Sequence, residues 1–381
     1  MLLLTIFLLF LTYSSAQKVI DLKSFRGGRV HNPIDNPGPY ALFVSASSDL
    51  VDHLNQISVV SEDGSTQTMS ELIANKRFPE SSLLAPFPVV KSAYVISNLT
   101  DYQMNTLTGF MFVSSSKQLQ DDSFYVFAVD SLRKWSWTGL GLINTTILFL
   151  NSNFDVTPWH STSISGWNQP SNAVNNLYIG FPKDTVEVPN SQIFSVPVLT
   201  TKGSANIANV EKFSLSLPTF YIKSYGGAQF TIEPSYYDVN NQATTAATTT
   251  GFYMKPINQV DKEIVINTVQ GNNVINGTVG ANVVGSVPDN GKVTIGEHDG
   301  LSFSSNSVHP VSQILAWSTQ GIGKMLEIDS ENTQAGEYYV QYYVMDGPQL
   351  PTTSRPVITT TKSSFTWKLL ISLLIPCLMS L

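Results

Sequence analysis

Residues 219–233 read Thr-Phe-Tyr-Ile-Lys-Ser-Tyr-Gly-Gly-Ala-Gln-Phe-Thr-Ile-Glu. A short run of aromatic and β-branched residues stands on either side of two glycines, and such runs favour β-strands. Similar runs, bounded by Gly, Pro, Asn or Asp, recur roughly every 8–12 residues through most of the chain, which is typical of β-sandwiches and barrels. The sequence therefore predicts an all-β protein made of tandem β-sandwich domains of jelly-roll type.

One segment departs from the strand pattern. Between residues 63 and 75, Met69, Leu72 and Ile73 have the spacing that places side chains on one face of a helix. We expect a short helix in this segment.

A motif occurs three times: a strand, a polar stretch, and then a small residue and a glycine that lead into an aromatic-rich strand. The small-residue–glycine pairs are Thr108-Gly109, Thr250-Gly251 and Ala335-Gly336. We interpret each copy as the closing hairpin of a sandwich. The unequal spacing of the copies leaves chance similarity as the alternative.

Residues 1–16 form an apolar run that ends in small residues at Ser14 and Ala16. This is the pattern of a secretory signal peptide, and cleavage would leave Gln17 as the first residue. The body of the chain then divides by composition into domains and a stalk. The predicted segments are a first β-sandwich at 17–117, a second β-rich domain at 118–260, a third at 261–347, a Thr/Ser/Pro-rich stalk at 348–366 and a hydrophobic tail at 367–381.

The tail is too short for a clean membrane-spanning helix, which needs about 20 mostly apolar residues. Extending it toward the N-terminus includes Lys368. An apolar tail after a polar stalk favours a signal for a glycosylphosphatidylinositol (GPI) anchor. A short tail anchor or transmembrane helix and a plain hydrophobic terminus remain open. We expect the protein on the outer face of the plasma membrane.

Composition excludes several classes of protein. The chain has 28 acidic and 21 Lys and Arg side chains, a formal net charge of −7, which argues against a nucleic-acid partner. Its one cysteine, Cys377, lies in the tail, so the domains contain neither disulfides nor thiolate zinc sites. Three Asn-x-Ser/Thr triplets, at Asn98, Asn144 and Asn276, predict N-glycosylation of a secreted protein.

Four of the six tryptophans lie between residues 135 and 167. Trp135, Trp137 and Trp159, with the adjacent His160, are the candidate binding residues, because amphipathic rings suit carbohydrate stacking or a protein interface. The same rings suit packing in an ordinary β core, and both interpretations remain open at this point.

No nucleophile elbow, zinc-protease motif, phosphate-binding loop or calcium loop occurs in the sequence. The densest polar cluster, at residues 297–300, contains a His between acidic residues, and we interpret it as an exposed turn. The sequence predicts no catalytic residues, no metal ion and no cofactor.

The glycines at 27 and 28, the strand at 40–45, and the segments 94–97 and 108–113 carry a resemblance. Together they resemble the cysteine-poor CUB-like domains of nematode secreted proteins. The resemblance covers about the first 100 residues of the body, and residues 118–260 loosely. The cysteines and the acidic calcium-site pattern of ordinary CUB domains are absent, so no calcium role is implied.

The resemblance implies a non-enzymatic binding protein of an epithelial surface, acting in innate immune defence. Its partners would be an extracellular protein or carbohydrate, and the membrane through a lipid anchor. A structural or adhesive coat glycoprotein without a discrete ligand site is the alternative. A hydrolase is the third and least favoured interpretation.

Overall fold

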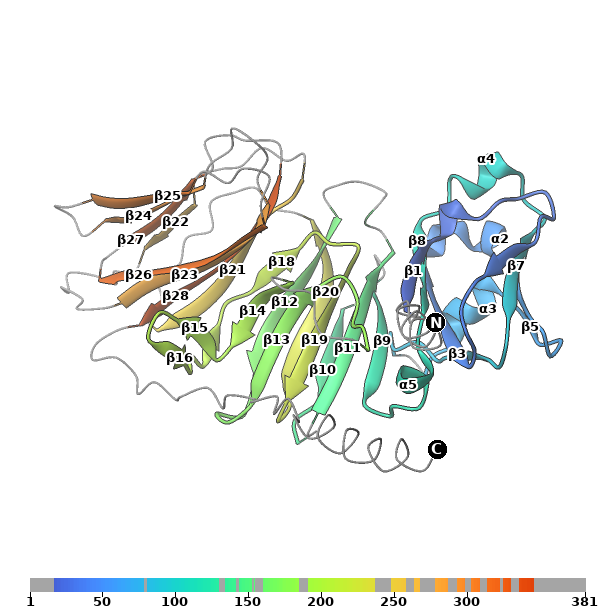
Figure 1. Ribbon diagram of the computed structural model, residues 1–381, viewed down its shortest axis with the longest axis horizontal. Coiled ribbons are helices and arrows are strands. Elements are labelled where there is room, and N and C mark those ends of the chain that lie inside the picture. The colour runs from blue at the N-terminus through green and yellow to red at the C-terminus, as the bar shows by residue number, and fades with distance from the viewer. Residues whose placement is uncertain are drawn as a thin grey trace, which may run out of the picture.

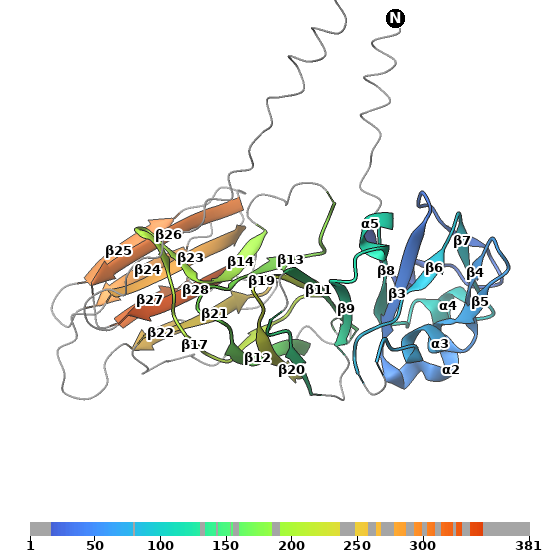
Figure 2. The same ribbon diagram turned by 90° about the horizontal axis from the view of Figure 1, so that it is seen from below.

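The computed structural model describes residues 17–78, 81–129, 134–141, 144–152, 154, 160–184, 191–236, 248–257, 264–267, 278–286, 293–298, 303–308, 314–322, 325–329 and 336–345. These residues are mostly β-strand, which confirms the predicted all-β class. Six sheets of four or five strands, numbered I to VI below, stand in a row as three successive pairs (Figures 1 and 2).

The N-terminal pair consists of sheets I and II. Sheet I contains, in order, β2 (Asn32–Ile34), β7 (Ala93–Ser97), β4 (Ile57–Ser61) and β5 (Thr66–Thr68). Sheet II contains β1 (Lys18–Asp21), β8 (Gly109–Val113), β3 (Tyr40–Ala46) and β6 (Phe87–Val89). The core between the sheets includes Tyr40, Val59 and Met111, all without exposed surface.

Short helices connect these strands. They are η1 (Leu22–Ser24), η2 (Ser48–Leu50), α2 (Val51–Leu54), α3 (Met69–Ala74), α4 (Asp101–Met104) and α5 (Ser116–Leu119). Helix α3 confirms the predicted helix. It begins with a capping box: the Glu71 amide donates to Thr68 Oγ1 at 3.1 Å, and the Thr68 amide donates to Glu71 Oε2 at 2.7 Å.

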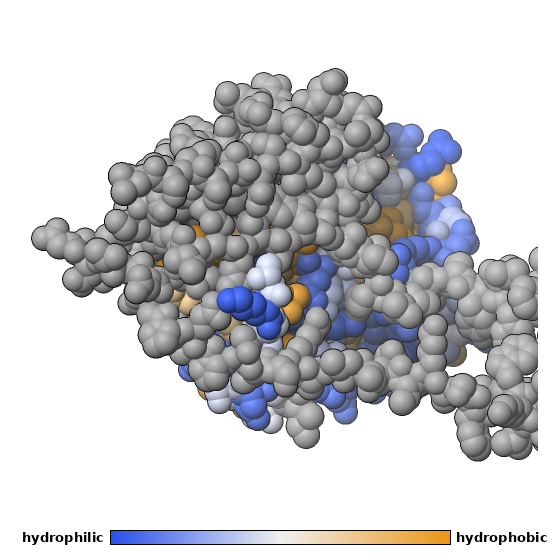
Figure 3. Space-filling model, turned by 60° about the vertical axis from the view of Figure 1, so that its left-hand side comes forward, coloured by the Kyte–Doolittle hydropathy of each residue, from blue (hydrophilic) through white to orange (hydrophobic). Residues whose placement is uncertain are grey.

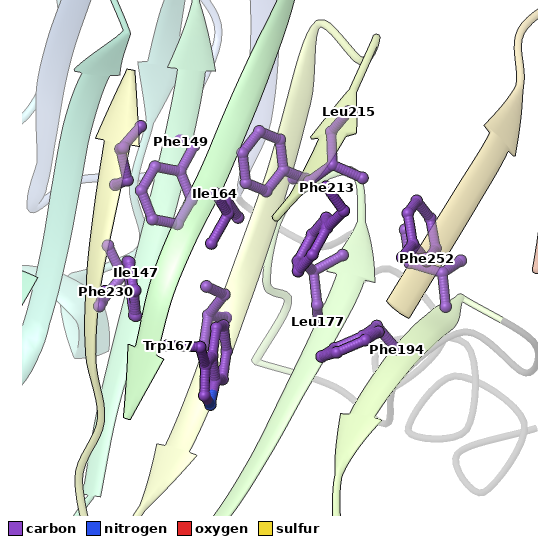
Figure 4. Packing of buried hydrophobic residues seen from close by; sticks show 14 of the residues in the cluster. Ile147, Phe149, Ile164, Trp167, Leu177, Phe194, Phe213, Leu215, Phe230 and Phe252 are labelled. Carbon is purple, nitrogen blue, oxygen red and sulfur yellow. The ribbon is translucent and has the colours of Figure 1, made fainter. Parts of the chain in front are cut away.

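The middle pair consists of sheets III and IV. Sheet III contains, in order, β14 (Gln192–Val196), β13 (Val174–Ile179), β19 (Thr219–Tyr225), β11 (Asn144–Asn151) and β9 (Phe124–Val129). Sheet IV contains β10 (Trp135–Thr138), β20 (Gln229–Tyr236), β12 (His160–Asn168) and β18 (Phe213–Leu215). Phe149 and Ile164 lie in the core between them (Figure 4).

The C-terminal pair consists of sheets V and VI. Sheet V contains, in order, β17 (Asn209–Val210), β21 (Thr249–Lys255), β28 (Glu337–Met345), β23 (Thr278–Ser286) and β26 (Ile314–Ile322). Sheet VI contains β22 (Ile264–Asn267), β27 (Met325–Asp329), β24 (Val293–His298) and β25 (Phe303–Val308). A hairpin of β15 (Val198–Thr200) and β16 (Gly203–Ala205) packs against Tyr343 of sheet V.

The N-terminal and middle pairs share a second core. Phe43 and Phe112 of sheet II pack against Phe124 and Leu148 of sheet III. Sheet II is therefore covered on both faces, which explains why β3 and β8 are buried along their whole length.

Each open side of the middle sandwich is closed by a neighbour. On one side, Leu83 from the N-terminal region enters the core between sheets III and IV. Its flanking backbone extends sheet III beyond β9, since the Leu84 amide donates to Val126 O and the Ala128 amide to Ser82 O, both at 2.9 Å. On the other side, residues of sheet V fill the same core, among them Phe252, which is seen beside Phe194 and Phe213 in Figure 4.

The interpretation of the repeated motif as a closing hairpin is wrong. In each copy the two strands lie in different sheets: β7 and β8 in I and II, β20 and β21 in IV and V, and β27 and β28 in VI and V. The glycine allows close approach at the crossing, because a Cβ on Gly109 would lie 2.2 Å from Ser45 O. The motif marks a crossover between sheets.

The predicted domain boundary at residue 260 does not coincide with a division between sheets. Strand β21, in the segment predicted as the second domain, pairs with β28 of the third. The boundary at residue 117 falls within α5. The predicted signal peptide, stalk and tail lie outside the described residues, and among the described helices none is long and apolar enough to span a bilayer.

Candidate functional site

Strand β10 directs Trp135 and Trp137 toward the core of the middle sandwich. Trp137 is 6% exposed and meets Tyr125 edge-on at 5.1 Å between ring centroids. Trp135 is half-buried, and its ring lies 4.9 Å from that of Phe127. Both tryptophans thus pack as core residues, the second of the two interpretations that the sequence left open.

The other two candidate binding residues are only partly described. Trp159 lies outside the described residues. His160 is the first residue of β12, where its backbone pairs with Tyr236, and its side chain is outside the described part. Of the four candidate residues, the structure therefore describes the side chains of Trp135 and Trp137 alone, and these two pack in the core.

Arg77, from the N-terminal region, covers the outer side of this aromatic cluster. Its guanidinium lies 4.6 Å from the Tyr125 ring centroid. It also donates to the backbone oxygens of Phe124 and Asp122, at 3.2 and 3.3 Å. The sequence gave no sign of this contact, because residue 77 and its partners are far apart in the chain.

The outer face of sheet IV is the polar surface that sequence reasoning missed. Residues 161, 163 and 165 alternate with the inward-facing Thr162 and Ile164, so their serine side chains point away from this core, but Ser161 and Ser163 are buried and only Ser165 is partly exposed. On the adjacent strands, Ser136 Oγ and Thr231 Oγ1 lie 3.2 Å apart. This period-two alternation was the available signal, but β12 contains too few apolar residues to be recognised as a strand.

An ion triad crosses this face. Lys212 Nζ donates to Glu233 Oε1 at 2.6 Å, and Lys134 Nζ lies 3.7 Å from Glu233 Oε2. The hydrogen bond from Lys212 holds the pKa of Glu233 below its usual value, and the charges of both lysines act in the same direction. Ser163 pairs with Glu233 across the strands, and its buried hydroxyl makes no hydrogen bond within the described structure.

Two of the three predicted glycosylation sites are described, and both asparagines are exposed. Asn98 directly follows β7, and its Oδ1 accepts a hydrogen bond from Arg29 Nε at 3.1 Å. Asn144 is the first residue of β11. Asn276 lies outside the described residues.

Half of the polar cluster at residues 297–300 is described, and residues 299 and 300 lie outside the described residues. Glu297 and His298 lie within β24 and pair with Leu326 and Met325 of β27. Across the described part of the chain, no group of three or more His, Cys, Asp or Glu side chains is placed to hold a metal ion. In the space-filling view, the described side chains that remain visible are mainly hydrophilic (Figure 3).

A family model described as "Transmembrane glycoprotein" matches residues 37–378. The chain belongs to this transmembrane glycoprotein family. The match extends from the N-terminal pair of sheets into the hydrophobic tail, so the protein is a surface or membrane glycoprotein. No curated protein matches the chain.

Two solved structures are similar to the chain at very low identity. One is the uncharacterized protein lmo2446 from Listeria monocytogenes EGD-e, with 7% identity, 82% of this chain and 29% of that chain covered, and a TM-score of 0.18. The other is from Sulfolobus Turreted Icosahedral Virus, with 11% identity, coverage of 88% and 91%, and a TM-score of 0.17. The chain spans less than a third of the Listeria protein.

Proposed function

We propose that this transmembrane glycoprotein family member is a non-enzymatic binding protein that presents the outer face of sheet IV to an extracellular protein or carbohydrate. The observation that carries the proposal is the Lys134–Glu233–Lys212 triad on the outer face of sheet IV, which also bears the hydroxyl pair of Ser136 and Thr231. Serine and threonine hydroxyls and lysine ammonium groups donate hydrogen bonds of the kind that sugar hydroxyls and peptide carbonyls accept. The resemblance to CUB-like proteins extends this proposal to innate defence at an epithelial surface.

A binding assay tests this face directly. Fluorescent full-length protein in detergent is applied to an array of neutral and sialylated glycans and to fixed epithelial cells. We expect binding that falls at least tenfold in the K134A/K212A double variant and stays unchanged in K183A/K202A, which removes two lysines elsewhere. Equal binding by both variants, or no binding to either probe, would count against the proposal.

The second candidate is a structural or adhesive coat glycoprotein. Its support is the continuous packing of the three sheet pairs, which suits a stiff component of a surface layer. In the binding assay this function predicts that no single face matters, so the K134A/K212A variant would bind as the wild type does.

We further propose that a GPI anchor holds the protein at the outer face of the plasma membrane. A transmembrane tail is the alternative, and the family description favours it. A chain with one epitope tag after Gln17 and another after Leu381 separates the two. An anchored protein loses the second tag and is released from cells by phosphatidylinositol-specific phospholipase C, whereas a transmembrane protein keeps both tags and stays on the cells.

A further inference from the structure

Asn144 lies at one end of the outer face of sheet III, the face directed away from the core shared with sheet IV. In the antiparallel ladder, Asn144 stands opposite Tyr225 on β19, and Tyr225 stands opposite Val174 on β13. Directly paired residues point to the same face, and their Cβ atoms lie about 4.5–5.5 Å apart. Asn144 and Tyr225 are therefore immediate neighbours on one surface.

The next two rungs of the ladder identify this face. Counting back along β19 from Tyr225, the next residues on the same face are Lys223 and then Tyr221. The Lys223 ammonium lies 5.9 Å from the Tyr221 ring centroid, and Tyr221 belongs to the core beneath the N-terminal pair of sheets. The face is thus covered at the Tyr221 end and open at the Tyr225 end.

Tyr225 is 39% exposed. Within the described part of the chain, its side chain makes no hydrogen bond, and its ring contacts no other aromatic ring. Two glycines with positive φ follow it, and Gly227 approaches Leu140 so closely that a Cβ would lie 3.1 Å from the Leu140 Cα atom. Leu140 is also exposed, so two large apolar side chains lie at the end of the sheet that bears Asn144.

We propose that the first N-acetylglucosamine of a glycan on Asn144 packs against the ring of Tyr225. A pyranose ring has an apolar C–H face that suits the face of an aromatic ring, and the amide link to Asn144 places the sugar within reach of the cross-strand neighbour. Tyr225 is then the platform on which this glycan rests, and the glycan covers the open end of sheet III. The proposal depends on the chain entering the secretory pathway as a glycoprotein.

Asn98 provides the internal comparison. It lies one residue beyond β7, where its amide donates to the Gln56 carbonyl at 3.0 Å, so the residue opposite it is a glutamine rather than an aromatic residue, and Arg29 donates to its Oδ1. A glycan on Asn98 lacks the arrangement found at Asn144.

The test measures how fast endoglycosidase H cleaves each glycan of the folded, full-length protein. The protein is produced in cells that make only high-mannose glycans, and glycopeptide mass spectrometry follows the two sites separately. The enzyme cuts next to the first sugar, so packing on Tyr225 slows the reaction. We expect Asn144 to be cleaved more slowly than Asn98, and Y225S to accelerate cleavage at Asn144 by roughly threefold or more without changing Asn98.

Three variants complete the design. Y225F keeps the ring and is expected to keep the slow cleavage, and Y102S, which removes an 80% exposed tyrosine elsewhere, is the matched control. T146V abolishes the glycosylation triplet without altering Asn144 and is expected to lower Tm by about 2 °C. Y225S is then expected to lower Tm by less in the T146V background than in the wild type, because T146V has already removed the contact between the glycan and Tyr225.

Equal cleavage rates at the two sites, or rates unaffected by Y225S, would overturn the proposal. If Asn98 carries a glycan and Asn144 does not, this proposal is wrong, but the proposed surface function is unaffected. Absence of glycan from both asparagines would overturn the proposed surface function as well.

Discussion

The side-chain amide of Gln341 both accepts a hydrogen bond from the backbone of Ser195 and donates one to it. The Ser195 amide donates to Gln341 Oε1 at 3.1 Å, and Gln341 Nε2 donates to the Ser195 carbonyl at 2.8 Å. Ser195 lies on the edge strand β14, and Gln341 lies in the middle of β28. A side chain of sheet V therefore completes the hydrogen bonding at the free edge of sheet III, where another strand would otherwise pair.

Replacing Gln341 with Met tests this link. Gln341 is 2% exposed, so the variant leaves a buried amide and a buried carbonyl of Ser195 without partners. We expect the free energy of unfolding to fall by about 2–4 kcal/mol, since each unsatisfied buried group costs roughly 1–3 kcal/mol. Urea denaturation measures the change, with Q120M at an exposed position as the matched control. A loss of less than about 0.5 kcal/mol would show that the contact carries no stability.

Leu83 makes a second prediction. It is 2% exposed and lies in the core of the middle sandwich, although helix α3 before it and strand β6 after it belong to the N-terminal pair. The variant L83A is expected to lose about 2–5 kcal/mol, as large-to-small changes in cores do. Because this core includes side chains from all three pairs, calorimetry should show one cooperative transition that moves as a whole. A separate N-terminal transition, unmoved by L83A, would contradict the shared core, and V90A at a 63% exposed position is the control.

The sequence predicted individual strands better than their partners. Strand formation depends on local aromatic and β-branched runs, and these are visible in segments such as 219–225. Strands β19 and β20 are separated by three residues, yet they belong to sheets III and IV, because the glycines at 226 and 227 have positive φ and turn the chain between sheets. Such crossovers depend on contacts distant in sequence, such as that of Gly251, where a Cβ would meet the Tyr342 hydroxyl.

The candidate site was predictable only in part. Aromatic composition identified Trp137 but not its surroundings, because a tryptophan suits a core and a ligand platform equally well. Trp137 packs against Tyr125 in a core that also contains Leu83, and no local pattern connects either residue to position 137. The glycosylation triplets were found because that signal is local.

Arg77 is expected to be irreplaceable by Lys. Its planar guanidinium contacts the Tyr125 ring and two backbone oxygens at once, and a lysine ammonium cannot reproduce this geometry. We expect R77K to lose about 1–2 kcal/mol, close to the loss in R77Q. Urea denaturation of both variants tests this. Full stability of R77K would mean that charge alone suffices at this position.

Glu233 makes stability depend on pH. Its pKa is lowered in the folded protein, so the folded state binds fewer protons than the unfolded state, and the added stability is present above the unfolded pKa of about 4.5. This stability is lost as pH falls through the lowered folded pKa. Because both lysines are more than half exposed, we expect E233Q to cost no more than about 1 kcal/mol at pH 7. The difference in unfolding free energy between wild type and E233Q should shrink in 1 M salt, because the Debye length there is only about 3 Å. It should disappear in strong acid, where Glu233 is protonated. A difference that persists under both conditions would mean that the Glu233 side chain stabilises the sheet by packing rather than by charge.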